Sequence, residues 1–240
     1  MNYLCVNTKH LISDQEIKVS DRETLRHLIT ILGKKIGDLI KIKVLSQGVG
    51  EAEIKSLDTF QAVLKLTKLE KVKDSKNITL AIGACRPLMM KRILEHGTTL
   101  GVRDFIFFNS YFSEKSYLDS KILIPENSEK YILKGLSQTK KYVDPPSLSV
   151  ESKIEDIDLS SFAQKIYLHG PGQNYLSSST SMNENLIVFI GGERGWHESE
   201  LQYFKDQKVT EVAISESTLR VEFAMQAFMA QAEWVRNARR

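Results

Sequence analysis

The chain has 240 residues, of which 42% are hydrophobic, and a formal net charge of +3. This length allows one large core or two modest ones. Two cysteines far apart in sequence, Cys5 and Cys85, exclude a disulfide framework, and no His/Cys cluster has metal-ligand spacing. No segment has the apolar length of a bilayer span, and the first residues lack the features of a signal peptide. We therefore expect a cytoplasmic protein with no membrane segment and no bound metal.

The charge is distributed unevenly along the chain. Residues 1–75 hold 13 lysines and arginines against 10 acidic residues, whereas residues 76–240 hold 20 of each. A basic surface in the first third would attract polyanions such as nucleic acid. An ordinary solvated basic surface explains the same excess, so both interpretations stay open.

Residues 1–72 are predicted to form five short strands around a single helix. The helix begins at an N-cap, which is Asp21 or Ser20, and ends at Gly33. One of its faces carries four apolar residues: Leu25, Leu28, Ile29 and Leu32. Apolar and polar residues alternate, or nearly so, in the segments 39–45, 48–57 and 60–69. This pattern favours a small β-barrel, followed by a polar linker at 70–77.

Strands and helices alternate from residue 76 to the end of the chain. The predicted strands are 78–85, 104–108, 165–170, 186–192 and 210–215, and the predicted helices are 87–101, 126–142 and the segment after Arg220. Such alternation is typical of a mostly parallel sheet covered by helices. We therefore predict an α/β domain over residues 76–240.

Three of these strands end in loops that suit a ligand: LHGPG (168–172), IGGERGW (190–196) and ISESTLRVEFA (214–224). Ligands of open parallel sheets bind beyond the carboxyl ends of the strands. Glycine also lets backbone groups approach a ligand without a Cβ between them. His197 and Glu200 form a predicted capping box, so a helix would begin beside the second loop. Tight turns explain the glycines equally well, and the GxGxxG and GxxxxGK[ST] fingerprints are absent.

The helix after Arg220 is apolar on nearly every face. Four of its polar residues fall on one narrow stripe: Glu222, Gln226, Glu233 and Asn237. Such a helix is buried on two sides, inside a core or at a subunit interface. Arg220 and Glu222 stand at its start, where charges are costly unless they bind something. A capping ion pair between these two residues is the alternative.

Several stretches follow the motif order of one known family. IGGERGWHESEL (190–201) resembles the signature IGPEGGF…E, and STLRVEFA (217–224) resembles the motif R-I-L-R-x-E-T-A. HLITILGKKIGD (27–38), LGV (100–102) and LSQTKKY (136–142) are similar to further motifs in the same order. These motifs belong to the RsmE-type ribosomal RNA methyltransferases of the SPOUT superfamily, and the resemblance covers nearly the whole chain.

The resemblance implies an N-terminal PUA-like β-barrel that holds RNA (1–72). It also implies a SPOUT-type α/β domain with a C-terminal trefoil knot (76–240), which binds S-adenosylmethionine and assembles as a homodimer. The glycines would make room for adenine and ribose against bare backbone. Residues of the three loops would bind the cofactor: Leu168, His169, Gly170, Ile190, Gly191, Gly192, Glu193, Gly195, Ile214, Ser215 and Leu219.

The reaction implied by the resemblance is methylation of N3 of a uridine in 16S ribosomal RNA, free or in the small subunit. The N3–H proton must leave, and the nitrogen must be aligned with the methyl group. Arg220 stays protonated and suits a phosphate or a uracil oxygen. Glu222 is the candidate that accepts or relays the proton, or it orients Arg220. His169 is a further candidate for this proton transfer.

Four lysines in the basic first third are expected to contact RNA phosphates together with Arg220: Lys34, Lys35, Lys41 and Lys43.

The chain departs from the family pattern at five positions: Thr99, Gly192, Arg194, Ser217 and Phe223. Two of these changes alter charge near the expected uridine site, so a different RNA target stays open. A ribosome-assembly factor that binds RNA without turnover is a second possibility, although retention of Arg220 and Glu222 favours an enzyme. A different α/β enzyme, such as a nucleotide hydrolase, is the third. The absence of a phosphate loop and of a nucleophile cluster counts against it.

Overall fold

The computed structural model describes residues 3–13, 15–74, 76–170, 172, 174–176, 182 and 184–238. Pro171, which belongs to the first predicted loop, lies outside them. The chain forms two compact units, one of Met1–Ser75 with Leu136–Pro145 and one of Lys76–Gly135 with Pro146–Arg240. The predicted division differs, because it left 136–145 in the second domain. No helix in the described part of the chain has the length and apolar character needed to cross a membrane.

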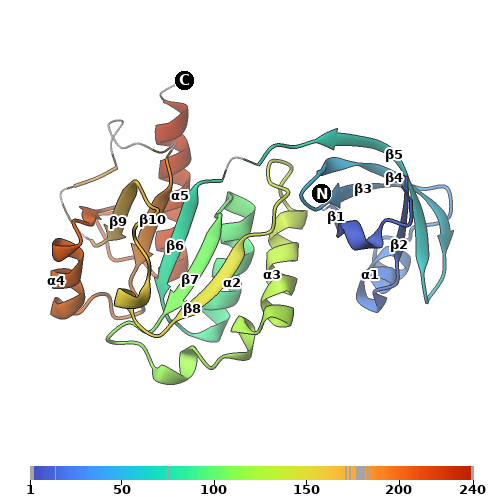
Figure 1. The fold of residues 1–240 in the computed structure, drawn as a ribbon. Coiled ribbons are helices and arrows are strands. Elements are labelled where there is room, and N and C mark those ends of the chain that lie inside the picture. Colours follow the sequence, from blue (N-terminus) through green and yellow to red (C-terminus); the bar gives the residue numbers. More distant parts are fainter. Residues whose placement is uncertain are drawn as a thin grey trace. The chain divides into compact units, whose positions relative to one another are not determined.

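The first unit contains a five-stranded mixed sheet in the order β1-β3-β4-β5-β2 (Figure 1). Its strands are β1 (Leu4–Val6), β2 (Glu16–Val19), β3 (Leu39–Val44), β4 (Gly48–Leu57) and β5 (Ala62–Lys71). Only β1 and β3 pair in parallel among these strands. A short 3-10 helix, η1 (Thr8–His10), follows β1. Alternate residues of the strands pack with Leu25 and Leu28 into one apolar core.

The helix of this unit begins at the predicted N-cap. Helix α1 spans Arg22–Arg26, and the Asp21 carboxylate accepts the backbone N–H of Thr24 at 2.8 Å. Of the two predicted capping residues, Asp21 is therefore the one that caps the helix.

A π-helical turn, η2 (His27–Ile31), continues α1 and changes which residues face the core. The N–H of Leu32 donates to the carbonyl of His27 at 2.9 Å, a wider turn than in an α-helix. Leu25 and Leu28 are buried, whereas Leu32 is 50% exposed. The prediction that Leu32 shares the buried face was wrong, because the wider turn rotates it away.

Lys43 lies in β3 with a fully buried side chain. Its Nζ donates to the carbonyl oxygens of Leu136 at 2.6 Å, Thr139 at 2.7 Å and Tyr142 at 2.5 Å. A buried ammonium is costly unless it is fully hydrogen-bonded, and three acceptors match its three donors. The prediction that Lys43 contacts an RNA phosphate is therefore wrong.

The same contacts of Lys43 explain why the helix predicted over 126–142 is shorter in the structure. Helix α3 spans Pro125–Ser137, whereas the sequence favoured a helix over 126–142. The carbonyl oxygens of Leu136, Thr139 and Tyr142 converge on the Lys43 ammonium, whereas the carbonyls of a continuing helix would all point along its axis. The chain therefore leaves the helix after Ser137.

The second unit contains a six-stranded sheet in the order β11-β9-β10-β6-β7-β8 (Figure 1). The strands are β6 (Ile78–Gly83), β7 (Asp104–Phe108), β8 (Ser147–Glu151), β9 (Gln164–Leu168), β10 (Leu186–Ile190) and β11 (Thr210–Val212). All neighbouring strands pair in parallel, which confirms the predicted sheet. Ile190 at the end of β10 lies opposite Ile82 and Leu168. The ends of β6, β9 and β10 are therefore level.

Helices cover both faces of this sheet. The covering helices are α2 (Pro87–Leu100), α4 (Glu198–Asp206) and α5 (Val221–Asn237). The segment between β7 and β8 contains α3 and two short 3-10 helices, Lys115–Tyr117 and Lys121–Leu123, and a third 3-10 helix, Ile154–Asp156, follows β8. One apolar cluster joins alternate residues of β6 and β10 to α2 and α5. A second cluster joins the opposite face to Phe204 of α4. This three-layer arrangement is the predicted α/β fold.

The first half of the polar stripe on α5, Glu222 and Gln226, lies against α2, whereas Glu233 and Asn237 are exposed. Glu222 is 2% exposed, and its Oε1 lies 3.4 Å from Nη1 of Arg92. One turn further along each helix, Nε2 of Gln226 lies 2.8 Å from Nδ1 of His96. The two helices therefore share a polar seam within an otherwise apolar contact.

The role of Lys43 leads to a stability prediction. Lys43→Met should lower the free energy of unfolding of the first unit by about 3 kcal/mol, because it leaves buried carbonyls without donors. Lys41→Met, which changes an exposed lysine of the same strand, should alter it by less than about 0.5 kcal/mol. Urea titration followed by circular dichroism measures both, and equal midpoints for the two variants would contradict the assignment.

Candidate functional site

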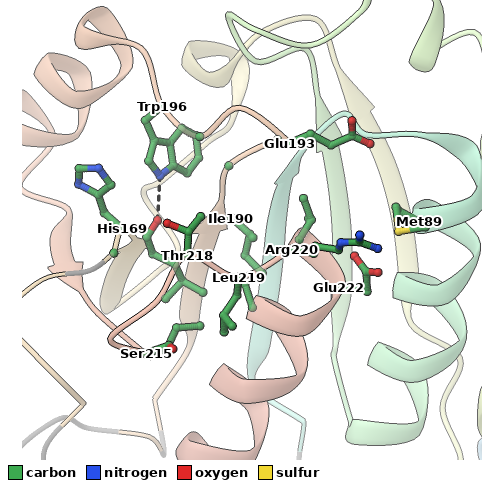
Figure 2. A pocket seen from close by; sticks show the side chains of 18 of the residues that line it. Met89, His169, Ile190, Glu193, Trp196, Ser215, Thr218, Leu219, Arg220 and Glu222 are labelled. Atoms are coloured by element: carbon green, nitrogen blue, oxygen red, sulfur yellow. Dashed lines mark hydrogen bonds between the residues drawn. The ribbon is translucent and has the colours of Figure 1, made fainter.

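The second unit contains a cavity of about 450 Å³ beyond the carboxyl ends of β9 and β10 (Figure 2). This volume lies within the range of small-molecule binding sites. Every residue predicted to bind a cofactor lines it, and so do both predicted catalytic residues: Leu168, His169, Gly170, Ile190, Gly191, Gly192, Glu193, Gly195, Ile214, Ser215, Leu219, Arg220 and Glu222. Sequence reasoning missed the remaining lining residues as site residues: Arg86, Met89, Trp196, Ser217, Thr218, Val221 and Ala224.

Trp196 joins two of the loops that form the cavity. Its indole Nε1–H donates to the carbonyl oxygen of Leu168 at 2.8 Å (Figure 2). The ring stacks on Phe108 with centroids 6.3 Å apart, and it meets Phe204 edge-on at 4.8 Å. The loop after β10 is therefore fixed to the end of β9 and to the core beneath.

The glycines of this loop serve different purposes. A Cβ on Gly191 would lie 3.2 Å from Cε2 of Trp196, so the indole packs directly on bare backbone. Gly195 has a φ of +71°, a conformation that side-chain-bearing residues rarely adopt, and open space lies beside it. The predicted role of glycine, to make room for a ligand, therefore suits Gly195. At Gly191 the glycine lets two parts of the protein approach each other.

Gly83 and Gly192 allow a second close approach. A Cβ on Gly83 would lie 2.7 Å from the backbone nitrogen of Gly192, closer than real Cβ contacts. A Cβ on Gly192 would lie 3.3 Å from the hydroxyl oxygens of both Ser110 and Ser113. The loops after β6, β7 and β10 therefore pack together on one side of the cavity.

Glu222 has one carboxylate oxygen without a hydrogen-bond partner. The side chain is 2% exposed, its Oε1 faces Arg92 at 3.4 Å, and its Oε2 has no partner in the described part of the chain. Buried polar atoms in proteins are nearly always hydrogen-bonded. The second oxygen of Glu222 therefore remains able to accept a hydrogen bond at the cavity wall.

Arg220 is the N-cap residue of α5 and is exposed. No described residue forms a hydrogen bond or ion pair with its guanidinium, and Glu222 pairs with Arg92. The alternative of a capping pair between Arg220 and Glu222 is therefore not realised. Figure 2 shows both side chains on the α5 side of the cavity. The guanidinium is available to an anion there.

Arg86 and Glu193 link the start of α2 to the loop after β10. Nε of Arg86 lies 3.4 Å from Oε2 of Glu193, and the Arg86 backbone N–H donates to Oε1 at 3.3 Å. The Arg86 side chain is 70% exposed, so the pair adds little to stability. Its effect is to hold the Glu193 carboxylate at the cavity rim.

His169 lies at the opposite rim beside two further polar residues. Its Nδ1 is 3.8 Å from Oε1 of Glu211, whose Oε2 accepts the hydroxyl proton of Tyr167 at 2.7 Å. Burial, and then the hydrogen bond to Glu211, raise the pKa of Tyr167. The phenol therefore stays protonated and serves as a donor that holds Glu211.

Cys85 is excluded as a nucleophile. Burial, reinforced by Glu193 and Glu222, raises the pKa of its thiol to about 12. A thiol with this pKa is protonated at neutral pH, and only the thiolate is reactive. The described residues include no group of three or more His, Cys, Asp or Glu side chains that could hold a metal ion.

Comparison with known proteins identifies the family. Residues 72–233 match the model of the RNA methyltransferase domain. The chain is 30% identical over 201 residues to ribosomal RNA small subunit methyltransferase E 1 of Borreliella burgdorferi, which covers 82% of this chain and 84% of that protein. The chain belongs to the RsmE-type RNA methyltransferases. It is also 30% identical over 207 residues to ribosomal RNA small subunit methyltransferase E of Treponema pallidum, with 82% and 77% covered.

Solved structures of methyltransferases have the same fold. A ribosomal RNA small subunit methyltransferase E from Neisseria gonorrhoeae, bound to S-adenosylmethionine, has a TM-score of 0.81 at 17% identity over 97% of this chain and 98% of its own. A protein from Porphyromonas gingivalis named as a probable rRNA-methyltransferase has a TM-score of 0.80 at 19% identity, over 99% of this chain and 100% of its own. At these low identities, the similarity to the solved structures shows a shared fold and nothing further.

The close approach of Gly83 to Gly192 leads to a second prediction. Gly83→Ala should destabilise the second unit by about 1–3 kcal/mol, because its methyl group overlaps backbone that cannot move freely. Gly170→Ala places a methyl group 3.6 Å from the nearest described atom, the Ser215 carbonyl oxygen, and should change stability by less than about 0.5 kcal/mol. Thermal unfolding curves of the two variants measure the difference, and a Gly83→Ala curve as stable as the control would refute the predicted clash.

Proposed function

We propose that this protein is an S-adenosylmethionine-dependent methyltransferase that modifies N3 of a uridine in the 16S RNA of the small ribosomal subunit. The observation that carries the proposal is the single cavity where the residues of all three predicted loops meet Arg220 and Glu222. The names of the two curated relatives and the cofactor of the Neisseria gonorrhoeae structure support it. The RNA substrate assigns the activity to the cytoplasm.

The cavity residues fit S-adenosylmethionine in size and chemistry. The cavity volume of about 450 Å³ suits a small molecule with an aromatic ring system and a polar tail. Four apolar side chains line it and would pack on the adenine: Leu168, Ile190, Ile214 and Leu219. Bare backbone at Gly195 leaves space for the sugar. When bound, the cofactor supplies an electrophilic methyl group.

Arg220 and Glu222 divide the work on the nucleotide in this proposal. The exposed guanidinium of Arg220 holds a phosphate or a uracil oxygen through paired hydrogen bonds. The free Oε2 of Glu222 accepts the N3–H proton or relays it, while Arg92 retains Oε1. Arg92 is thus a positioning residue that fixes which carboxylate oxygen faces the substrate. His169, beside Glu211, belongs to the cavity wall.

We further propose that the first unit is a PUA-like β-barrel that binds RNA, and that the second is a SPOUT-type domain with a C-terminal trefoil knot. Lys35 and Lys41 are exposed and Lys34 is half-buried, with its Nζ 3.2 Å from the carbonyl oxygen of Leu39. Such lysines contact phosphates and position RNA without reading its sequence. Lys43 has no part in this surface.

A homodimer through α5 completes the proposal. Two large apolar side chains of this helix are exposed, Phe223 at 50% and Trp234 at 67%. They lie close to whole turns apart, so they share one face. Exposed apolar faces of this kind mark interfaces between subunits.

The activity is tested with Arg220→Ala. This variant should transfer labelled methyl groups from S-adenosylmethionine to small-subunit RNA about 100-fold to 1,000-fold more slowly, because one charge-stabilising group is lost. Its cofactor affinity should stay unchanged. Lys205→Ala, which removes an exposed charge on α4 outside the cavity, is the control and should keep full activity.

Wild-type activity for Arg220→Ala would remove Arg220 from the chemistry. No methyl incorporation by the wild-type protein, into free RNA or small subunits, would favour the ribosome-assembly factor without turnover.

The dimer is tested by analytical ultracentrifugation at micromolar concentration. The wild-type protein should sediment as a dimer, and Trp234→Glu should shift it toward the monomer because the charge would be buried at the interface. Ile31→Glu is the matched control, since Ile31 is also 67% exposed but lies in the first unit. A wild-type monomer would rule out the dimer, and equal dissociation by both variants would move the interface away from α5.

A further inference from the structure

Three aromatic rings form an exposed cluster at the carboxyl edge of the sheet in the second unit. We name Tyr111, Phe112 and His197 the aromatic platform. Tyr111 is 63% exposed and Phe112 39% exposed. The Tyr111 ring stacks on His197 with centroids 3.5 Å apart and planes 10° apart. Phe112 meets the same imidazole edge-on at 5.6 Å. The Tyr111 ring and part of the Phe112 ring are therefore exposed to solvent.

The platform is fixed in place by a buried carboxylate. Glu200 is 6% exposed, and its Oε1 accepts the backbone N–H of Tyr111 at 3.2 Å. Its Oε2 accepts the backbone N–H of His197 at 2.9 Å. The imidazole Nδ1 of His197 in turn accepts the N–H of Ser199 at 3.2 Å, at the start of α4. Two loops from different strands are thus held by one side chain before any ligand arrives.

The loop that carries Tyr111 and Phe112 packs on a loop that lines the cavity. The loop that carries Tyr111 packs on the loop after β10, because a Cβ on Gly192 would touch both Ser110 and Ser113 at 3.3 Å. The Ser113 hydroxyl also donates to the carbonyl of Ala84 at 2.7 Å, and the two serine hydroxyl oxygens lie 2.9 Å apart. Gly192 itself lines the cavity. The loops that carry the platform therefore adjoin the cavity.

We propose that the aromatic platform stacks an unpaired base of the RNA substrate, next to the nucleotide that enters the cavity. This inference rests on the proposed function, which supplies the RNA. A base that leaves its stack to reach a catalytic pocket deprives its neighbour of a stacking partner. Exposed aromatic rings are the surfaces on which proteins stack such single-stranded bases. Because the rings are already ordered, stacking costs little conformational entropy.

The polar groups of the rings and the position of their loops favour a base over another apolar partner. Tyr111 has a polar hydroxyl and His197 a polar ring, and both suit the wet, amphipathic face of a nucleobase. The loops that carry the rings adjoin the cavity, where the substrate must arrive. A second copy of this chain that covers the platform is the competing occupant, and the experiment separates the two.

The test compares Tyr111→Ala with Tyr111→Phe in the full-length protein. The probe is a single-stranded RNA of about 12 nucleotides that contains the fluorescent base 2-aminopurine, whose emission is quenched when it stacks. Tyr111→Ala should bind the RNA about 5-fold to 150-fold more weakly and lose the quenching. Tyr111→Phe keeps the ring and should retain both. Affinity for S-adenosylmethionine and the thermal unfolding midpoint should be unchanged in both variants.

Wild-type affinity and quenching in Tyr111→Ala would overturn the inference. A change from dimer to monomer in Tyr111→Ala, measured by ultracentrifugation, would overturn it in favour of a contact between two copies. RNA binding is measured here without methyl transfer. A wild-type protein that does not methylate RNA but quenches the probe through Tyr111 therefore supports the stacking platform and rejects only the proposed function.

Discussion

The hydrogen bond from the indole of Trp196 to the carbonyl of Leu168 joins two loops that lie 28 residues apart in sequence, and the cavity depends on it. The level ends of the parallel strands bring those loops to the same edge, but level ends alone do not fix their shape. Gly191 lets the indole lie on bare backbone, and Phe108 and Phe204 hold the ring from the core. Sheet packing thereby determines the geometry of a binding site.

A polar seam between two largely apolar helices forms the second determinant of the site. The seam between α2 and α5 pairs Arg92 with Glu222 and His96 with Gln226. It uses one oxygen of the Glu222 carboxylate and leaves the other open. A charge in such a position is destabilising in itself. The cost of burying Glu222 would be offset by a substrate donor that reaches its second oxygen.

Local sequence signals were sufficient for most elements and for the place of the site. Pro87 and Gly101 mark the two ends of α2 as expected, and the capping box of His197 and Glu200 is present. Apolar runs that end in glycine-rich or polar loops predicted three strand ends, and the rule that ligands bind there predicted the cavity. Strand β8 (Ser147–Glu151) was missed, because its residues are mostly exposed and lack an apolar run.

Long-range contacts could not be predicted from one sequence. Lys43 looked like a surface lysine because its acceptors lie 93 to 99 residues away. Arg92 escaped notice for the same reason, since Glu222 is 130 residues further along the chain. The π-helical turn that exposes Leu32 leaves no local signal in composition. For Lys43 and Arg92, a partner from another element decides the outcome.

Isothermal titration calorimetry with S-adenosylmethionine tests the central claim most directly, using the wild-type protein, Gly191→Val and Gly33→Asn. Valine at position 191 would displace Trp196, whereas Gly33 has a left-handed φ that asparagine tolerates and lies in the first unit. The account predicts that the wild-type protein and Gly33→Asn bind the cofactor equally, and that Gly191→Val loses measurable binding while it remains folded. Unchanged affinity in Gly191→Val, or no binding by the wild-type protein, would contradict it.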